Sequence, residues 1–154
     1  MITIHGNIFD HFMPHDVMVH GCNAQGVMGS GIAAQVRELF PAAYDTYRRV
    51  YEQSGLDLGE VVYHVTDDRK VIANAITQQF FGADPRVRYA SYDAIDDAFK
   101  NIFDMCAKFD LKGKVLVPKI GAGLGNAHWG AITEIIDHRA SPYDIPVFYV
   151  EYQK

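Results

Sequence analysis

Cysteine is scarce in this sequence of 154 residues, where Cys22 and Cys106 are the only two. They form no C-x-x-C pair and no His/Cys cluster at zinc spacing, which excludes a disulfide framework and predicts two reduced thiols. No apolar run reaches the ~18 residues that a membrane-spanning helix requires. The first residues also lack the basic start and long apolar stretch of a signal peptide. We therefore expect a cytoplasmic protein with no membrane partner.

Positive charge is also in short supply, with 14 Lys and Arg against 19 Asp and Glu and a formal net charge of -5. Nucleic-acid binding depends on clustered positive charge, so this balance predicts no broad nucleic-acid surface. An anionic ligand would instead be held locally by backbone groups. Hydrophobic residues make up 49% of the chain, and no repeat or linker divides it, so we expect a single domain over residues 1–154.

Hydrophobic periodicity alternates between short strand-like runs and longer helix-like runs, which is typical of helices packed around a partly parallel sheet. Six strands are predicted, at residues 2–5, 17–20, 60–65, 70–76, 114–118 and 146–152. Helices are predicted at residues 31–41, 43–53 and 91–109, and from residues 127–129 to the Ser141-Pro142 pair. Ser91 is suited to cap the third of these helices. Residues 79–89 have the composition of a loop that covers a site.

Glycine is concentrated in two segments that each follow a predicted strand. We call residues 21–31 the first glycine loop and residues 119–126 the second glycine loop. Ligands of open α/β sheets bind beyond the carboxyl ends of the strands, so two such loops would form opposite walls of one cleft. Glycine permits positive φ and close backbone approach, which allows successive N–H groups to point at a phosphate or diphosphate. The helix that follows the first loop would add its dipole.

Each glycine loop taken alone is also compatible with a simple tight turn. The sequence contains neither the G-x-x-x-x-G-K-[ST] phosphate loop nor the G-x-S-x-G elbow. Gly121-Ala122-Gly123-Leu124-Gly125 does not match the G-x-G-x-x-G fingerprint, and the acidic residue expected downstream is missing. These absences disfavour a nicotinamide-dependent oxidoreductase.

The two loops together carry a family resemblance that covers nearly the whole chain. Its motifs are Gly6-Asn7-Ile8, His20-x-x-Asn23-x-x-Gly26-x-Met28-Gly29-x-Gly31-Ile32-Ala33, and Pro118-x-Ile120-Gly121-x-Gly123-Leu124 followed by Trp129. This pattern resembles a macro domain, in the branch that contains yeast ADP-ribose-1″-phosphate phosphatase and the terminal ADP-ribose protein glycohydrolases. The resemblance implies a three-layer α/β/α sandwich with a mixed, largely parallel six-stranded sheet. It also implies a cleft that binds ADP-ribose, without a cofactor or metal.

The resemblance assigns ligand contacts along this cleft. Adenine would lie at Asn7 and Ile8, the distal ribose at Asn23, and the diphosphate within the second glycine loop. The family usually has Gly-Asp-Ile where this chain has Gly6-Asn7-Ile8, so the neutral amide predicts weaker adenine affinity or selectivity. Either Tyr149 or Tyr152 would lie near adenine, and the sequence leaves that choice open. The implied ligand-binding residues are Asn7, Ile8, Asn23, Met28, Gly29, Ser30, Gly31, Ile32, Gln78, Lys119, Ile120, Gly121, Ala122, Gly123, Leu124, Gly125, Tyr149 and Tyr152.

The same comparison limits the chemistry. One glycohydrolase type in this branch uses a lysine that attacks the distal ribose and an aspartate after the second glycine loop. The matching positions here are Gln78 and Gly125. A glutamine cannot form an imine, and a glycine cannot carry a proton. The resemblance therefore favours an ADP-ribose 1″-phosphate phosphatase. The alternatives are an ADP-ribose-binding module without turnover, or removal of ADP-ribose from an ADP-ribosylated protein by a route that uses no lysine.

The catalytic candidates are His20 and Asn23. His20 ends a predicted strand three residues before Asn23, and a histidine ordinarily titrates at about pH 6.5, which suits proton transfer near neutral pH. Alternatively, His20 packs beneath the loop and satisfies a backbone carbonyl. His128 is a second choice for the acid–base group. Trp129 is expected to lie in the core between the last helix and the sheet.

Overall fold

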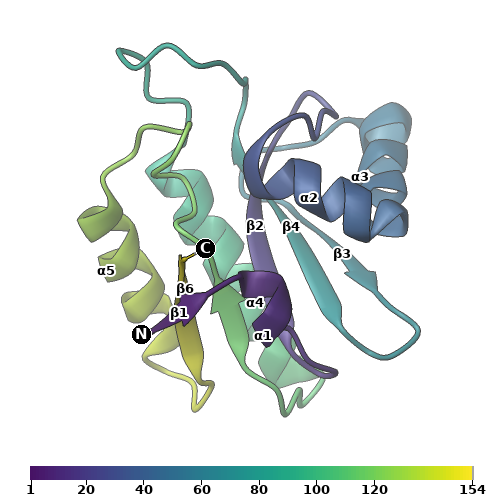
Figure 1. The fold of residues 1–154 in the computed structure, drawn as a ribbon, viewed down its shortest axis with the longest axis vertical. Helices are drawn as coiled ribbons and strands as arrows, with labels where there is room; N and C mark the ends of the chain where they lie inside the picture. The colour runs from purple at the N-terminus through teal and green to yellow at the C-terminus, as the bar shows by residue number, and fades with distance from the viewer. Residues whose placement is uncertain (154) are drawn as a thin grey trace.

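The computed structural model describes residues 1–153 and has a central sheet between two layers of helices (Figure 1). Its strands are β1 (Ile2–Gly6), β2 (Val17–Asn23), β3 (Val61–Val65), β4 (Val71–Gln78), β5 (Val115–Val117) and β6 (Val147–Tyr152). They lie in the order β1-β6-β5-β2-β4-β3, and every neighbouring pair is parallel except β3 and β4. This arrangement confirms the predicted mixed, largely parallel sheet in a three-layer α/β/α fold.

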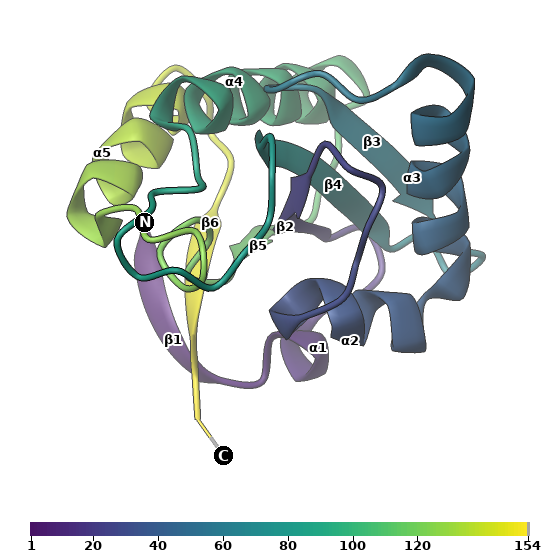
Figure 2. The same ribbon diagram turned by 90° about the horizontal axis from the view of Figure 1, so that it is seen from above.

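The helices divide between the two faces of the sheet (Figure 2). One face is covered by α4 (Tyr92–Lys108) and α5 (Trp129–Ala140). The other face is covered by α1 (Ile8–His11), α2 (Gly31–Leu39) and α3 (Pro41–Ser54). The sequence predicted all of these helices except α1, whose four residues are too few to show helical periodicity.

Side-chain alternation along β2 explains how one strand supports both cores. Val17 and Val19 pack in the core beneath α4 and α5, whereas Met18 packs in the core beneath α1 and α2. Strands that are buried on both faces read as continuous apolar runs, which is why the sequence predicted β2 clearly. No helix within residues 1–153 is long and apolar enough to cross a membrane.

Local signals fix the ends of the helices. The Ser91 hydroxyl accepts a hydrogen bond from the Ala94 amide at 3.1 Å, which confirms the predicted cap of α4. Pro41 occupies the first turn of α3, where its missing N–H costs nothing, and it prevents α2 from continuing. Trp129 packs between α5 and the sheet as predicted, with its ring on the ring of Tyr149 at a centroid distance of 4.8 Å, although it is only half-buried.

Candidate functional site

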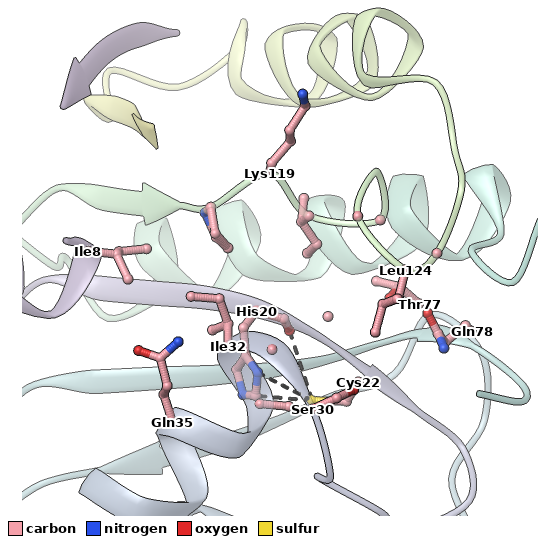
Figure 3. A pocket seen from close by; sticks show the side chains of 18 of the residues that line it. Ile8, His20, Cys22, Ser30, Ile32, Gln35, Thr77, Gln78, Lys119 and Leu124 are labelled. Carbon is pink, nitrogen blue, oxygen red and sulfur yellow. Dashed lines mark hydrogen bonds between the residues drawn. The ribbon is translucent and has the colours of Figure 1, made fainter. Parts of the chain in front are cut away.

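A cavity of about 940 Å³ lies beyond the carboxyl ends of the central parallel strands. Both glycine loops line it, together with the ends of β1, β4 and β6. Figure 3 shows Ile8 at one end of this cavity and Gln78 with Leu124 at the other. The volume is within the ~300–1,000 Å³ of small-molecule sites. The expectation that two separate glycine segments face one cleft is therefore met by the geometry.

The first glycine loop is held in place by Asn23 and Tyr47. The Tyr47 hydroxyl, which is fully buried on α3, donates to the Asn23 main-chain oxygen at 2.7 Å. Asn23 Nδ2 donates to the Val27 oxygen at 2.8 Å, and Asn23 Oδ1 accepts from the Gln25 amide at 3.0 Å. Asn23 is 8% exposed. Its side chain is thus committed to shaping the loop.

Two positions in the second glycine loop require glycine. Gly121 has φ of +75°, a conformation that side chains rarely adopt. A Cβ on Gly125 would lie 2.6 Å from the Gly121 oxygen. The Gly121 oxygen also accepts from the Ala127 amide at 2.9 Å, which closes the loop on itself. The loop is therefore a fixed main-chain surface along the cavity.

Residues 79–89, which we call the strap, accept hydrogen bonds from side chains of both glycine loops. Gln25 Nε2 donates to the Gln79 oxygen at 3.0 Å on one side. Asn126 Nδ2 donates to the Asp84 and Val87 oxygens at 3.0 and 2.7 Å on the other. The strap contributes residues 81–83 to the cavity lining. The sequence predicted this loop but gave no signal that Phe81 would line the site.

His20 is buried beneath the cavity, with 1% of its surface exposed. It lies opposite Asn74 in the pairing of β2 with β4, and its Nε2 is 2.5 Å from Asn74 Oδ1. Asn74 Nδ2 donates to the Ala43 oxygen on α3 at 3.3 Å, so Oδ1 faces the ring and His20 Nε2 carries the proton. The alternative prediction that His20 satisfies a backbone carbonyl is therefore wrong, because its partner is the side-chain amide of Asn74.

Burial controls the titration of His20. Removal from water lowers its pKa to about 4, although the hydrogen bond to Asn74 acts in the opposite direction. The ring is consequently neutral at pH 7 and poorly suited to donate a proton there. The sulfur of Cys22 lies 3.7 Å from Nε2 (Figure 3), and burial raises the pKa of that thiol, so it is not a reactive thiolate.

The two tyrosines of β6 occupy different surroundings. Tyr149 faces α5, where its ring packs on Trp129. Tyr152 pairs in register with Gly6 and is 67% exposed at the end of the cavity that Asn7 and Ile8 line. The Tyr149 ring is therefore packed against Trp129, whereas the Tyr152 ring is exposed at this end of the cavity.

The structure brings together most of the residues that the sequence indicated. The predicted residues that line the cavity are Asn7, Ile8, His20, Asn23, Gly29, Ser30, Gly31, Ile32, Gln78, Lys119, Ile120, Gly121, Gly123, Leu124, Gly125, Tyr149 and Tyr152. Met28 does not line it, because its side chain is 1% exposed and packs in the core with Tyr47. Ala122 does not line it either and packs toward the core beneath α4 and α5.

Sequence reasoning also missed lining residues, including Thr77 and Gln35. Thr77 precedes Gln78, the last residue of β4, so the rule that ligands bind at strand ends could have found it. Gln35 follows Gly31 by one helical turn on α2. Lys119 is the only Lys or Arg among the described residues that line the cavity, and its ammonium points away from the interior (Figure 3). Within residues 1–153, no three His, Cys, Asp or Glu side chains are placed to hold a metal ion.

Comparison with known proteins identifies the family. The family model of the macro domain matches residues 19–136. An ADP-ribose 1″-phosphate phosphatase of Scheffersomyces stipitis is 32% identical, covering 82% of this chain and 87% of the relative. A DNA ADP-ribosyl glycohydrolase of Thermus aquaticus is 25% identical, covering 86% of this chain and 36% of the relative. The solved structure of Thermosipho africanus DarTG in complex with ADP-ribose matches with a TM-score of 0.80 at 19% identity, over 98% of this chain and 42% of that chain. The chain therefore belongs to the macro domain family.

Proposed function

We propose that the cavity binds ADP-ribose and that the protein hydrolyses ADP-ribose 1″-phosphate to ADP-ribose and phosphate. The observation that carries this proposal is the convergence of both glycine loops on one cavity of about 940 Å³. Their main-chain N–H groups supply donors for a diphosphate without a cationic cluster. The name of the Scheffersomyces stipitis relative supports the phosphatase reaction, and the ADP-ribose in the Thermosipho africanus structure supports the ligand.

The shape of the cavity orients the ligand in this proposal. The purine lies at the end formed by Asn7, Ile8 and Tyr152, where an apolar wall and an exposed ring suit a planar base. The diphosphate lies between the two glycine loops. The distal ribose and its 1″-phosphate then reach the end formed by Gln78 and Leu124.

The reaction transfers a phosphoryl group to water, breaking the bond between phosphorus and the ribose O1″. The water oxygen bonds to phosphorus, and a proton passes to the departing O1″. Transition states of this kind are loose, so positioning of the water and donors for the phosphoryl oxygens supply most of the catalysis. We assign Asn23 to hold the first glycine loop in this geometry. His20 is assigned a positioning role between β2 and β4, because its lowered pKa opposes proton donation.

A binding module without turnover is the second candidate function. It is favoured by the position of Glu151, the only carboxylate among the described residues that line the cavity. Glu151 lies on β6 next to Tyr152, at the purine end and away from the 1″-phosphate. A lysine-dependent glycohydrolase is disfavoured because Gln78 replaces the lysine, and its Nε2 donates to the Phe80 oxygen at 2.7 Å. Release of ADP-ribose from a protein without a lysine has no specific observation in its favour.

Phosphate release from ADP-ribose 1″-phosphate separates these functions. We expect release by the wild type and a rate lowered about tenfold or more by Asn23→Ala, because misplaced reacting groups cost this much. His20→Gln can still donate to Asn74, so it retains most activity if His20 is a positioning residue and loses it if His20 donates the proton. Absence of release, with ADP-ribose still bound in calorimetry, would leave only the binding module.

A further inference from the structure

The hydroxyl of Thr77 is a polar group that the fold leaves without a partner at the base of the cavity. Thr77 lines the cavity and is 1% exposed, and within residues 1–153 its hydroxyl makes no hydrogen bond. Every fully buried side-chain nitrogen or oxygen in the same part of the chain has a partner. The small exposed surface of Thr77 therefore belongs to its hydroxyl, which is reached from the cavity.

Thr77 lies where the two glycine loops leave the sheet. A Cβ on Gly21, the first residue of the first glycine loop, would lie 2.8 Å from Thr77 Oγ1 and 3.3 Å from Ile120 Cγ1 in the second glycine loop. The absence of a side chain at Gly21 thus leaves open the space beside the hydroxyl. Figure 3 shows Thr77 at the same end of the cavity as Gln78 and Leu124.

The backbone holds this hydroxyl in a fixed position. Thr77 is the penultimate residue of β4, which pairs with β2 on one side and β3 on the other. Its main-chain oxygen accepts from the amide of Ser91, the N-cap of α4, at 2.8 Å. Branching at Cβ restricts the rotation of the side chain as well. The hydroxyl is therefore preorganised, as a group that acts on a substrate must be.

An attacking water needs a hydrogen-bond acceptor, and the other acceptors that line the cavity are committed or distant. Asn23 Oδ1 already accepts from main-chain amides of its own loop and from a tyrosine hydroxyl. Glu151 lies at the purine end. Gln78 is held against the strap, where its Nε2 donates to a main-chain oxygen at 2.7 Å. The Thr77 hydroxyl has two lone pairs and no such commitment.

Building on the proposed function, we infer that the Thr77 hydroxyl binds the water that attacks the 1″-phosphate, which makes Thr77 a catalytic residue. The hydroxyl oxygen accepts a hydrogen bond from the water, so that a lone pair of the water faces phosphorus. As the water oxygen bonds to phosphorus, the bond from phosphorus to O1″ breaks. One proton of the water passes to O1″, the other stays on the phosphate, and Thr77 keeps its own. The main-chain N–H groups of the glycine loops remain available for the phosphoryl oxygens.

Thr77→Val tests this inference, because valine has the same shape without the hydroxyl. We expect kcat for phosphate release from ADP-ribose 1″-phosphate to fall about tenfold, the value of one hydrogen bond. KM, and the dissociation constant for ADP-ribose in calorimetry, should stay within about twofold, because the water is part of neither ligand. The unfolding midpoint should be unchanged or higher, since the protein loses no internal hydrogen bond.

Two further variants serve as controls. Thr77→Ser keeps the hydroxyl and should restore most of kcat. Thr3→Val makes the same exchange at an exposed position of β1 that does not line the cavity, so kcat should be unchanged.

The outcomes separate this inference from the function on which it rests. Unchanged kcat in Thr77→Val overturns the inference and leaves the phosphatase reaction intact. A raised KM or weaker ADP-ribose binding also overturns it, since the hydroxyl would then contact the ligand itself. Failure of Thr77→Val to fold, or a lower unfolding midpoint, would show that the hydroxyl has a partner within the fold, with the same consequence. Absence of phosphate release by the wild type overturns the proposed reaction, and the inference with it.

Discussion

The hydroxyl of Tyr47 links the core beneath α3 to the cavity, and its removal tests whether that link shapes the site. In Tyr47→Phe the Asn23 main-chain oxygen loses a buried donor at 2.7 Å. A lost hydrogen bond, together with the desolvation of the acceptor left behind, costs about 2 kcal/mol. For a chain of this length, that loss lowers the unfolding midpoint by about 4–8 °C.

The same substitution should weaken ligand binding, although Tyr47 does not line the cavity. If about 1 kcal/mol is needed to reorder the first glycine loop, affinity for ADP-ribose falls about fivefold. The assays are thermal unfolding and calorimetry. Tyr44→Phe is the matched control on the same helix, because within residues 1–153 the Tyr44 hydroxyl has no hydrogen-bond partner. The reasoning is refuted if the two variants are equally stable, or if Tyr47→Phe is destabilised with unchanged affinity.

Three further predictions concern the second glycine loop, the strap and His20. Gly125→Ala places a Cβ 2.6 Å from the Gly121 oxygen, so the loop must shift and ADP-ribose affinity in calorimetry should fall about tenfold; unchanged affinity would contradict this geometry. Asn126→Ala removes the donors to the Asp84 and Val87 oxygens, so amide hydrogen exchange in the strap should accelerate about tenfold, whereas an unchanged rate would show that these bonds do not hold it. His20 titrates at about 4 when folded and at 6.5 otherwise, so between these values the unfolded chain binds more protons. The shift therefore contributes about 3 kcal/mol to the free energy of unfolding above pH 6.5, and this contribution is lost as the pH falls to 4. Equal pH dependence of the unfolding free energy for wild type and His20→Gln, measured by chemical denaturation, would refute this prediction.

The sequence predicted the fold well because its signals are local. Apolar runs, Ser91 and Pro41 specify where strands and helices lie, and short connections between them restrict the topology. The prediction ended β2 at His20, whereas the strand continues to Asn23. Glycine and asparagine in residues 21–23 read as a turn, but pairing with β4 holds them in the sheet, with an irregularity between Cys22 and Asn23.

The parts of the site that sequence reasoning missed depend on contacts between distant residues. His20 and Asn74 are 54 residues apart, so the hydrogen-bond partner of His20 has no local signature in the sequence. Met28 lies within a loop motif, yet its apolar side chain gains more from packing beside Tyr47 than from facing the cavity. The contact of Tyr149 with Trp129, which distinguishes its surroundings from those of Tyr152, likewise joins residues that are distant in the sequence.

Calorimetric titration of the wild-type protein with ADP-ribose, ADP and NAD tests the central claim most directly. Convergence of two glycine loops on one diphosphate, beside a cavity end that accepts a free distal ribose, predicts a dissociation constant for ADP-ribose in the micromolar range and weaker binding of intact NAD. Absence of heat with ADP-ribose, or tighter binding of NAD, would contradict that claim.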